Sequence, residues 1–203
     1  MAALHGILGS MSSSSKRTTG HGRASLVLAL AGLVSSAQPA RADDAQAPVI
    51  KETPVPDHAL PRFDATLTIA APMEKIWALI SDCHRMREVM DLESSELVAR
   101  HGKVERCKLV VDLPFPFGKL RSIVEETDES RPGLLRQSWK LVSGDYLYDE
   151  GFWELSSPEP GSTRVRYVGL TEPKLPVPRG MLTNGQRDYI VKMLLRLRQL
   201  VTR

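Results

Sequence analysis

The strongest constraint on the fold is a series of strand-like segments with very short connections, which runs through residues 92–171. His101-Gly102 has the length of a two-residue hairpin loop, and Arg131-Pro132-Gly133 and Ser143-Gly144-Asp145 are turn sequences. Such connections join antiparallel neighbours, because a parallel pair needs a crossover of a dozen or more residues. Alternating apolar and polar residues predict six strands, at residues 97–100, 103–113, 120–127, 134–142, 146–155 and 163–171.

One earlier strand and three helices complete the expected fold. Residues 63–69 alternate like a half-buried strand, and residues 73–80 then follow a helical apolar pattern. Ser81-Asp82 can cap a second short helix that ends near Met90, and a long amphipathic helix follows Pro178. We therefore predict an α+β domain over residues 63–203. Its curved, seven-stranded antiparallel sheet would surround the C-terminal helix, with the helix pair between the first two strands.

The first 42 residues are typical of a cleavable signal peptide. They contain four basic residues and no acidic one, an apolar run at residues 24–34, and the small-x-small site Ala40-Arg41-Ala42. The apolar run is shorter than the roughly 20 residues that a membrane span needs. An uncleaved anchor or a transit peptide is the alternative, and Met11 is a second candidate start. We predict a periplasmic or secreted protein with a flexible lead-in at residues 43–62.

Charge and cysteine content limit the other classes of function. In the chain without the predicted signal peptide, the numbers of acidic and basic residues are nearly equal, and the Lys and Arg residues form no long run. Nucleic acid is therefore not an expected partner. Cys83 and Cys107 could form a disulfide in an oxidising compartment, or could be two separate small buried side chains. Two cysteines alone are too few ligands for a metal site, and we expect neither a metal nor a cofactor.

Several short motifs resemble those of the START-like (SRPBCC) superfamily, and they occur in the same order. The stretch at residues 70–82, AAPMEKIWALISD, is similar to the signature that follows the first strand in that superfamily. GFWEL at residues 151–155 and GSTRV at residues 161–165 resemble the motifs that the superfamily has at the end of its sheet. LPFPF at residues 113–117 resembles a Pro-Phe turn between two strands of START domains. The chain looks closest to the branch of coenzyme-Q-binding proteins and polyketide cyclases. The resemblance implies the helix-grip fold.

That resemblance also implies a ligand cavity between the inner face of the sheet and the terminal helix. Plain core packing is the alternative role for each large apolar residue in this region. The residues we expect to line the cavity are Leu109, Val111, Trp139, Leu141, Trp153, Tyr167, Tyr189, Met193 and Leu197.

The sequence offers one catalytic candidate. Asp149 shares strand parity with Gly151 and Trp153, so it could point into the cavity and act as an acid or base. It could instead be a strand-end residue near solvent. The sequence contains no zinc-binding, nucleophile-elbow or phosphate-binding motif. These observations favour a binding protein over an enzyme.

Phe115 and Phe117 occupy a loop where polar residues are usual. They could touch a membrane transiently or form a lid over the cavity. Our expectation is an exported protein that binds or carries a hydrophobic small molecule such as a quinone, lipid or isoprenoid. The alternatives are a cyclase or dehydratase that acts on a polyketide-like substrate, and an interaction module of the cell envelope.

Overall fold

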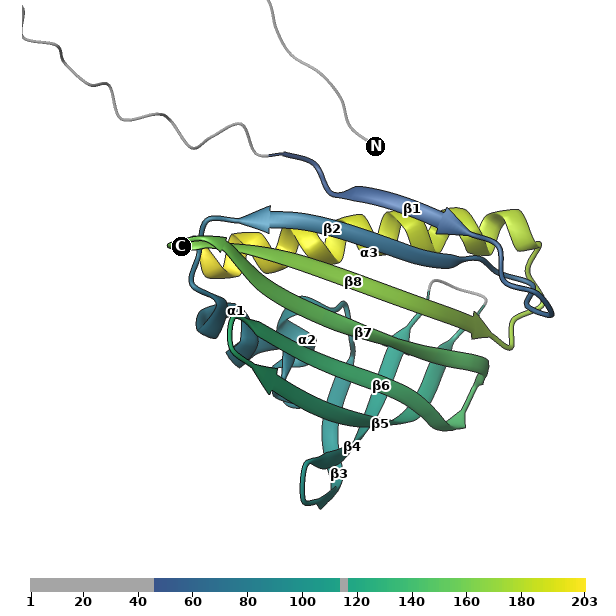
Figure 1. Cartoon of the computed structure of the whole chain (residues 1–203). Coiled ribbons are helices and arrows are strands. Elements are labelled where there is room, and N and C mark those ends of the chain that lie inside the picture. Colours follow the sequence, from purple (N-terminus) through teal and green to yellow (C-terminus); the bar gives the residue numbers. More distant parts are fainter. Residues whose placement is uncertain (1–45, 114–116) are drawn as a thin grey trace, which may run out of the picture. The chain divides into compact units, whose positions relative to one another are not determined.

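The computed structural model describes residues 46–113 and 117–203. The predicted signal peptide and Phe115 lie outside the described residues. In the described part, a single antiparallel sheet curves around a long helix, as Figure 1 shows. The described residues contain no helix that is long and apolar enough to span a bilayer.

The sheet has the strand order β1-β2-β8-β7-β6-β5-β4-β3, and every neighbouring pair is antiparallel. Strands that follow one another along the chain are neighbours from β3 to β8, as their short connections predict. Their bounds are β1 Val49–Thr53, β2 Arg62–Ile69, β3 Ser94–His101, β4 Val104–Asp112, β5 Lys119–Arg131, β6 Leu134–Gly144, β7 Tyr146–Glu159 and β8 Ser162–Pro173.

Two short helices follow β2, and the long helix ends the chain. Helix α1 spans Met73–Ile80, α2 spans Met86–Val89 and α3 spans Arg179–Val201. The Asp82 carboxylate accepts a hydrogen bond from the His84 backbone N–H at 2.8 Å, which satisfies a free donor in the turn before α2. This arrangement confirms the predicted helix-grip fold.

The strand β1 is an addition to the seven predicted strands. Val49–Thr53 pairs with β2 at the sheet edge, and Ile50 packs against the main core. The expectation that residues 43–62 lack regular structure is therefore wrong for this segment. The sequence signal is weak because the strand is only five residues long and has prolines just outside both ends.

The main core lies between α1, the C-terminal half of α3 and the strands β2, β7 and β8. Phe63, Leu155, Leu194 and Leu197 are almost completely buried there. A second, smaller cluster lies under β4 and β5 and contains Cys83, Cys107 and Val124. The division of the apolar residues into two clusters allows a cavity to form beside the main core.

A disulfide joins Cys83, in the segment between α1 and α2, to Cys107 on β4. The two Cα atoms lie 5.9 Å apart, a usual separation for bridged cysteines. The structure thus favours the paired alternative over two separate thiols. The bridge fixes the start of α2, which also contributes to the cavity, against the sheet.

Candidate ligand-binding site

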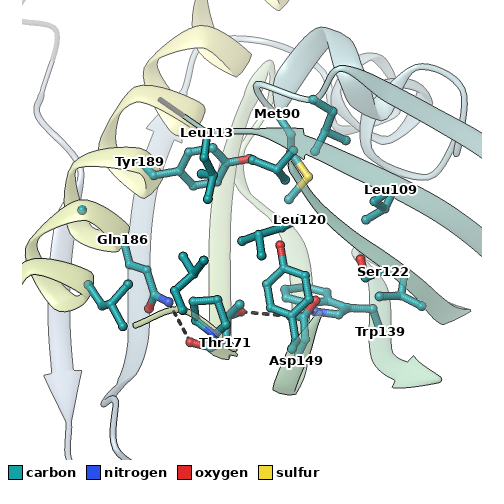
Figure 2. A pocket seen from close by; sticks show the side chains of 18 of the residues that line it. Met90, Leu109, Leu113, Leu120, Ser122, Trp139, Asp149, Thr171, Gln186 and Tyr189 are labelled. Atoms are coloured by element: carbon teal, nitrogen blue, oxygen red, sulfur yellow. Dashed lines mark hydrogen bonds between the residues drawn. The ribbon is translucent and has the colours of Figure 1, made fainter. Parts of the chain in front are cut away.

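A cavity of about 490 Å³ lies between the concave face of the sheet, α2, the β8–α3 connection and the N-terminal half of α3. Most of its lining is apolar, and Figure 2 shows side chains that point into it from α3 and from the strands. Phe117 and Met181 line the cavity and are also 39% and 62% exposed, so they lie at its opening. A partly open, apolar cavity of this size suits a small hydrophobic ligand.

Six of the nine predicted wall residues line this cavity: Leu109, Val111, Trp139, Trp153, Tyr167 and Tyr189. Met193 and Leu197 belong to the main core, because only the N-terminal half of α3 borders the cavity. Leu141 is half-buried opposite Val124 and is not part of the cavity wall. Helical periodicity gives the buried face of α3 but not the point along the helix where the cavity ends.

The sequence analysis missed the contributions of α2 and of β5 to the wall. Met86 and Met90 line the cavity from α2 and the residue after it. On β5 the inward-facing residues alternate with outward-facing ones, a signal that could have identified them. These β5 residues are Leu120, Ser122, Val124 and Glu126.

Asp149 faces the cavity from β7, so the interpretation of a solvated strand-end residue does not hold. The indole N–H of Trp139 donates to its Oδ1 at 3.1 Å, and the Thr171 hydroxyl donates to the same atom at 2.9 Å (Figure 2). Burial raises the pKa of the Asp149 carboxyl above its usual value, and the two hydrogen bonds oppose that shift. Asp149 is therefore an oriented polar group in an apolar wall.

Three aromatic rings form a continuous part of the cavity wall. Trp139 stacks on Tyr167 with ring centroids 5.4 Å apart, and Trp153 meets Tyr167 edge-on at 4.9 Å. Gly151 and Gly169 are cross-strand partners on the same sheet face. A Cβ atom on Gly151 would clash with the Val168 carbonyl oxygen on β8 and would lie 2.5 Å from the Trp139 ring. The absence of a side chain at Gly151 therefore lets the indole lie flat against the sheet.

Substitution Gly151→Ala is expected to displace the Trp139 ring and to weaken ligand binding about tenfold, while also lowering stability by about 1–3 kcal/mol through overpacking. A tryptophan emission spectrum and a ligand titration would measure the two effects. The matched control is Gly161→Ala in the β7–β8 turn, where the added Cβ would meet no atom within 4 Å but the φ of +76° is unfavourable for alanine. The control should lower stability without changing binding. Equal binding by both variants would contradict this account of the wall.

Glu126 is a second carboxyl group in the wall, and it is only 3% exposed. The Gln137 amide donates to its Oε2 over 3.4 Å, and the Cys107 sulfur lies 3.4 Å from the same oxygen. Burial is the main cause that raises the pKa of Glu126 to about 8, and the nearby Asp128 and Glu105 carboxylates raise it further. Glu126 is thus mostly protonated in the empty protein at neutral pH.

The raised pKa of Glu126 makes stability depend on pH. In the unfolded chain its pKa is the ordinary 4.5. Between that value and about 8, folding takes up a proton, so this residue reduces the free energy of unfolding by up to about 1.4 kcal/mol per pH unit as pH rises. The Glu126→Gln variant should therefore become progressively more stable than the wild type from about pH 5 to about pH 8. Urea unfolding of both proteins between about pH 5 and about pH 8 tests this prediction. A difference in the free energy of unfolding that stays constant with pH would contradict the raised pKa of Glu126.

The described residues contain no group of three His, Cys, Asp or Glu side chains arranged to hold a metal ion. The polar groups of the cavity are carboxyl, hydroxyl and amide groups together with an indole N–H. They can donate and accept hydrogen bonds and exchange protons with a ligand.

Comparison with known proteins gives consistent results. The family model described as "Polyketide cyclase / dehydrase and lipid transport" matches residues 69–198. A Streptomyces cyaneus protein named "Putative polyketide cyclase" is 27% identical over 103 residues, which is 50% of this chain and 66% of that protein. The match thus spans just under two thirds of that relative.

Solved structures share the fold at low sequence identity. A STAR-related lipid transfer protein from Xanthomonas axonopodis is 20% identical with a TM-score of 0.68, and the match covers 80% of this chain and 97% of that one. An aromatase/cyclase from a Streptomyces species is 12% identical with a TM-score of 0.53, covering 69% and 90%. These structures show that the fold is shared. The family match extends from the end of β2 into α3 and covers more than half of the chain. This protein belongs to the family described as polyketide cyclase / dehydrase and lipid transport.

Proposed function

We propose that this protein binds and carries a hydrophobic small molecule, such as a quinone, lipid or isoprenoid, in the cavity between the sheet and α3. The observation that carries the proposal is the 490 Å³ cavity with its mainly apolar wall. Burying roughly 300 Å² of ligand apolar area gives a gross gain of about 7 kcal/mol. The cost of immobilising the ligand consumes part of this gain, so we expect affinities in the micromolar range.

A ligand titration tests this proposal. Two of the three tryptophans line the cavity, so a bound molecule should change the intrinsic fluorescence. The panel would contain a short-chain ubiquinone, a long-chain alcohol and a farnesyl alcohol. Saturable binding of at least one of them, competed by another, is the expected result. A folded protein that binds none of the panel would contradict the proposal.

We also propose that the carrier is exported and exchanges its ligand at a membrane. Residues 1–42 have the pattern of a signal peptide, and a disulfide such as Cys83–Cys107 persists in oxidising compartments. Phe117 and Met181 provide apolar side chains at the cavity opening. The mass of the protein recovered from its host would test cleavage near Ala42. Sedimentation with vesicles, lost in Phe117→Ser, would test membrane contact.

A second candidate is a cyclase or dehydratase, because Asp149 places an oriented carboxyl group with a raised pKa in the cavity wall. Such a group could move a proton to or from a bound polyketide-like substrate. Turnover that is abolished in Asp149→Asn, with substrate binding retained, would favour this reading over a carrier.

A further inference from the structure

Within residues 46–113 and 117–203, the cavity has carboxyl groups in its wall but no basic side chain to pair with them. Glu126 and Asp149 line it, whereas no Lys, Arg or His is among the described residues of its wall. A ligand carboxylate or phosphate inside this cavity would find no counter-ion and would face two carboxyl groups. Burying an unpaired anion is costly, so the composition of the wall selects against acidic ligands.

The surroundings of Glu126 strengthen this bias. Glu105 lies directly opposite Glu126 on β4, and Asp128 is two residues along β5 on the same sheet face. Within the described part of the chain, the buried Oδ1 of Asp128 has no hydrogen-bond partner. Three carboxyl groups therefore gather at this end of the concave face. Glu105 forms an ion pair with Arg100 at 2.6 Å, whereas none of the ion pairs of the described residues involves Glu126 or Asp128.

Glu126 also has an oxygen available to a ligand. Its two contacts with the protein, from the Gln137 amide and the Cys107 sulfur, are both made through Oε2. Among the described residues no side chain donates a hydrogen bond to Oε1. A disulfide sulfur has no proton to donate, so the contact with Cys107 does not stabilise the charged carboxylate.

Aromatic rings complete the pattern. Five of them line the cavity from the sheet and from α3: Trp139, Tyr146, Trp153, Tyr167 and Tyr189. The faces of such rings attract cations, most strongly for tryptophan, and aromatic walls combined with carboxylates are a recurring solution for binding ammonium groups.

Building on the carrier function, we propose that the natural ligand is a lipophilic amine, and that the Glu126 carboxylate is the counter-ion of its ammonium group. The apolar tail occupies the wall formed by the methionine, leucine and valine side chains. The aromatic rings contact the ammonium carbon atoms, and Asp149 accepts a second hydrogen bond. Phospholipids do not fit this pattern, because their phosphate would lack a cation inside the cavity.

The proposal has a proton-linked signature. Without a ligand Glu126 is mostly protonated at neutral pH, and it faces Asp128 and Glu105, the second of which is paired with Arg100. Pairing with an ammonium group stabilises the carboxylate, so binding releases up to one proton. The affinity for an amine should therefore rise with pH up to about 8 and level off above it.

The test compares three probes with one tail: decylamine, 1-decanol and decanoate, which at about pH 7 are cationic, neutral and anionic. Calorimetry in buffers of different ionisation enthalpy gives both affinity and proton release. We expect decylamine to bind about tenfold more tightly than decanol, and decanoate to bind most weakly. Glu126→Gln should remove both the preference for decylamine over decanol and the proton release. The matched control is Glu96→Gln, an exposed position on β3.

The outcomes separate this inference from the carrier function. Tighter binding of decanol or decanoate than of decylamine would overturn the amine assignment and leave the carrier function intact. An unchanged preference for decylamine in a folded Glu126→Gln protein would overturn the role of Glu126 as the counter-ion. Failure of all three probes to bind would overturn the amine assignment, and the carrier function would fall as well only if the quinone and isoprenoid panel also failed to bind.

Discussion

Replacing Trp153 by alanine should lower the free energy of unfolding by about 3–5 kcal/mol and abolish ligand binding. Trp153 is 2% exposed and belongs both to the main core and to the cavity wall. Its removal takes away the edge-on contact with Tyr167 and joins the cavity to the space left in the core. Urea unfolding and a ligand titration would measure the two effects.

Trp139→Ala is the variant to compare with Trp153→Ala, because both remove an indole from the cavity wall. Trp139 is only half-buried, since one side of its ring faces the cavity, and its indole N–H donates to Asp149. This variant should cost about 1–2 kcal/mol of stability but weaken ligand binding about tenfold or more. The contrast between the variants distinguishes a core residue from a wall residue. Unchanged binding in a folded Trp139→Ala protein would show that the cavity is not the binding site.

Removing the disulfide should have the other large effect. The bridge closes a loop with a sequence separation of 24, for which chain entropy gives about 3.5 kcal/mol of stabilisation. The double variant Cys83→Ala/Cys107→Ala should therefore unfold at a lower urea concentration than the oxidised protein. Because the bridge also fixes the segment before α2, ligand dissociation should become faster.

A reducing agent provides the control for this prediction. It should destabilise the wild type by an amount similar to that of the double variant, and it should have no effect on the double variant itself. Equal stability of the wild type with and without the reducing agent, after the thiols are shown to be free, would contradict a stabilising role for the bridge.

Most of the fold could be predicted because its signals are local. The alternation and short turns of residues 92–171 predict antiparallel neighbours, and the helical pattern of α1 matches its observed bounds, Met73–Ile80. The edge strand β1 was missed because its five residues carry too short an alternation, and its pairing with β2 is a long-range event. Family resemblance supplied the helix-grip arrangement that periodicity alone does not specify.

The cavity could be predicted only in part, because strand parity gives the face of a residue and not its depth. Strand parity correctly placed Trp139, Trp153 and Tyr167 on the sheet face that lines the cavity. It did not separate Leu197, a core residue of α3, from Tyr189, a wall residue two turns earlier. Glu126 was missed for a different reason. A carboxyl group is seldom placed in an apolar wall on sequence evidence, because charged groups rarely occur unpaired in protein interiors.

The central claim is that the cavity holds a hydrophobic small molecule, and native mass spectrometry of the protein purified from its own host tests it most directly. The account predicts a bound species in about one-to-one ratio, lost on solvent extraction and absent from the Trp153→Ala variant. Identification of the extract would name the cargo and show whether it carries an amine. A folded protein that arrives empty, and that binds none of the added quinones, lipids, isoprenoids or amines, would contradict the account.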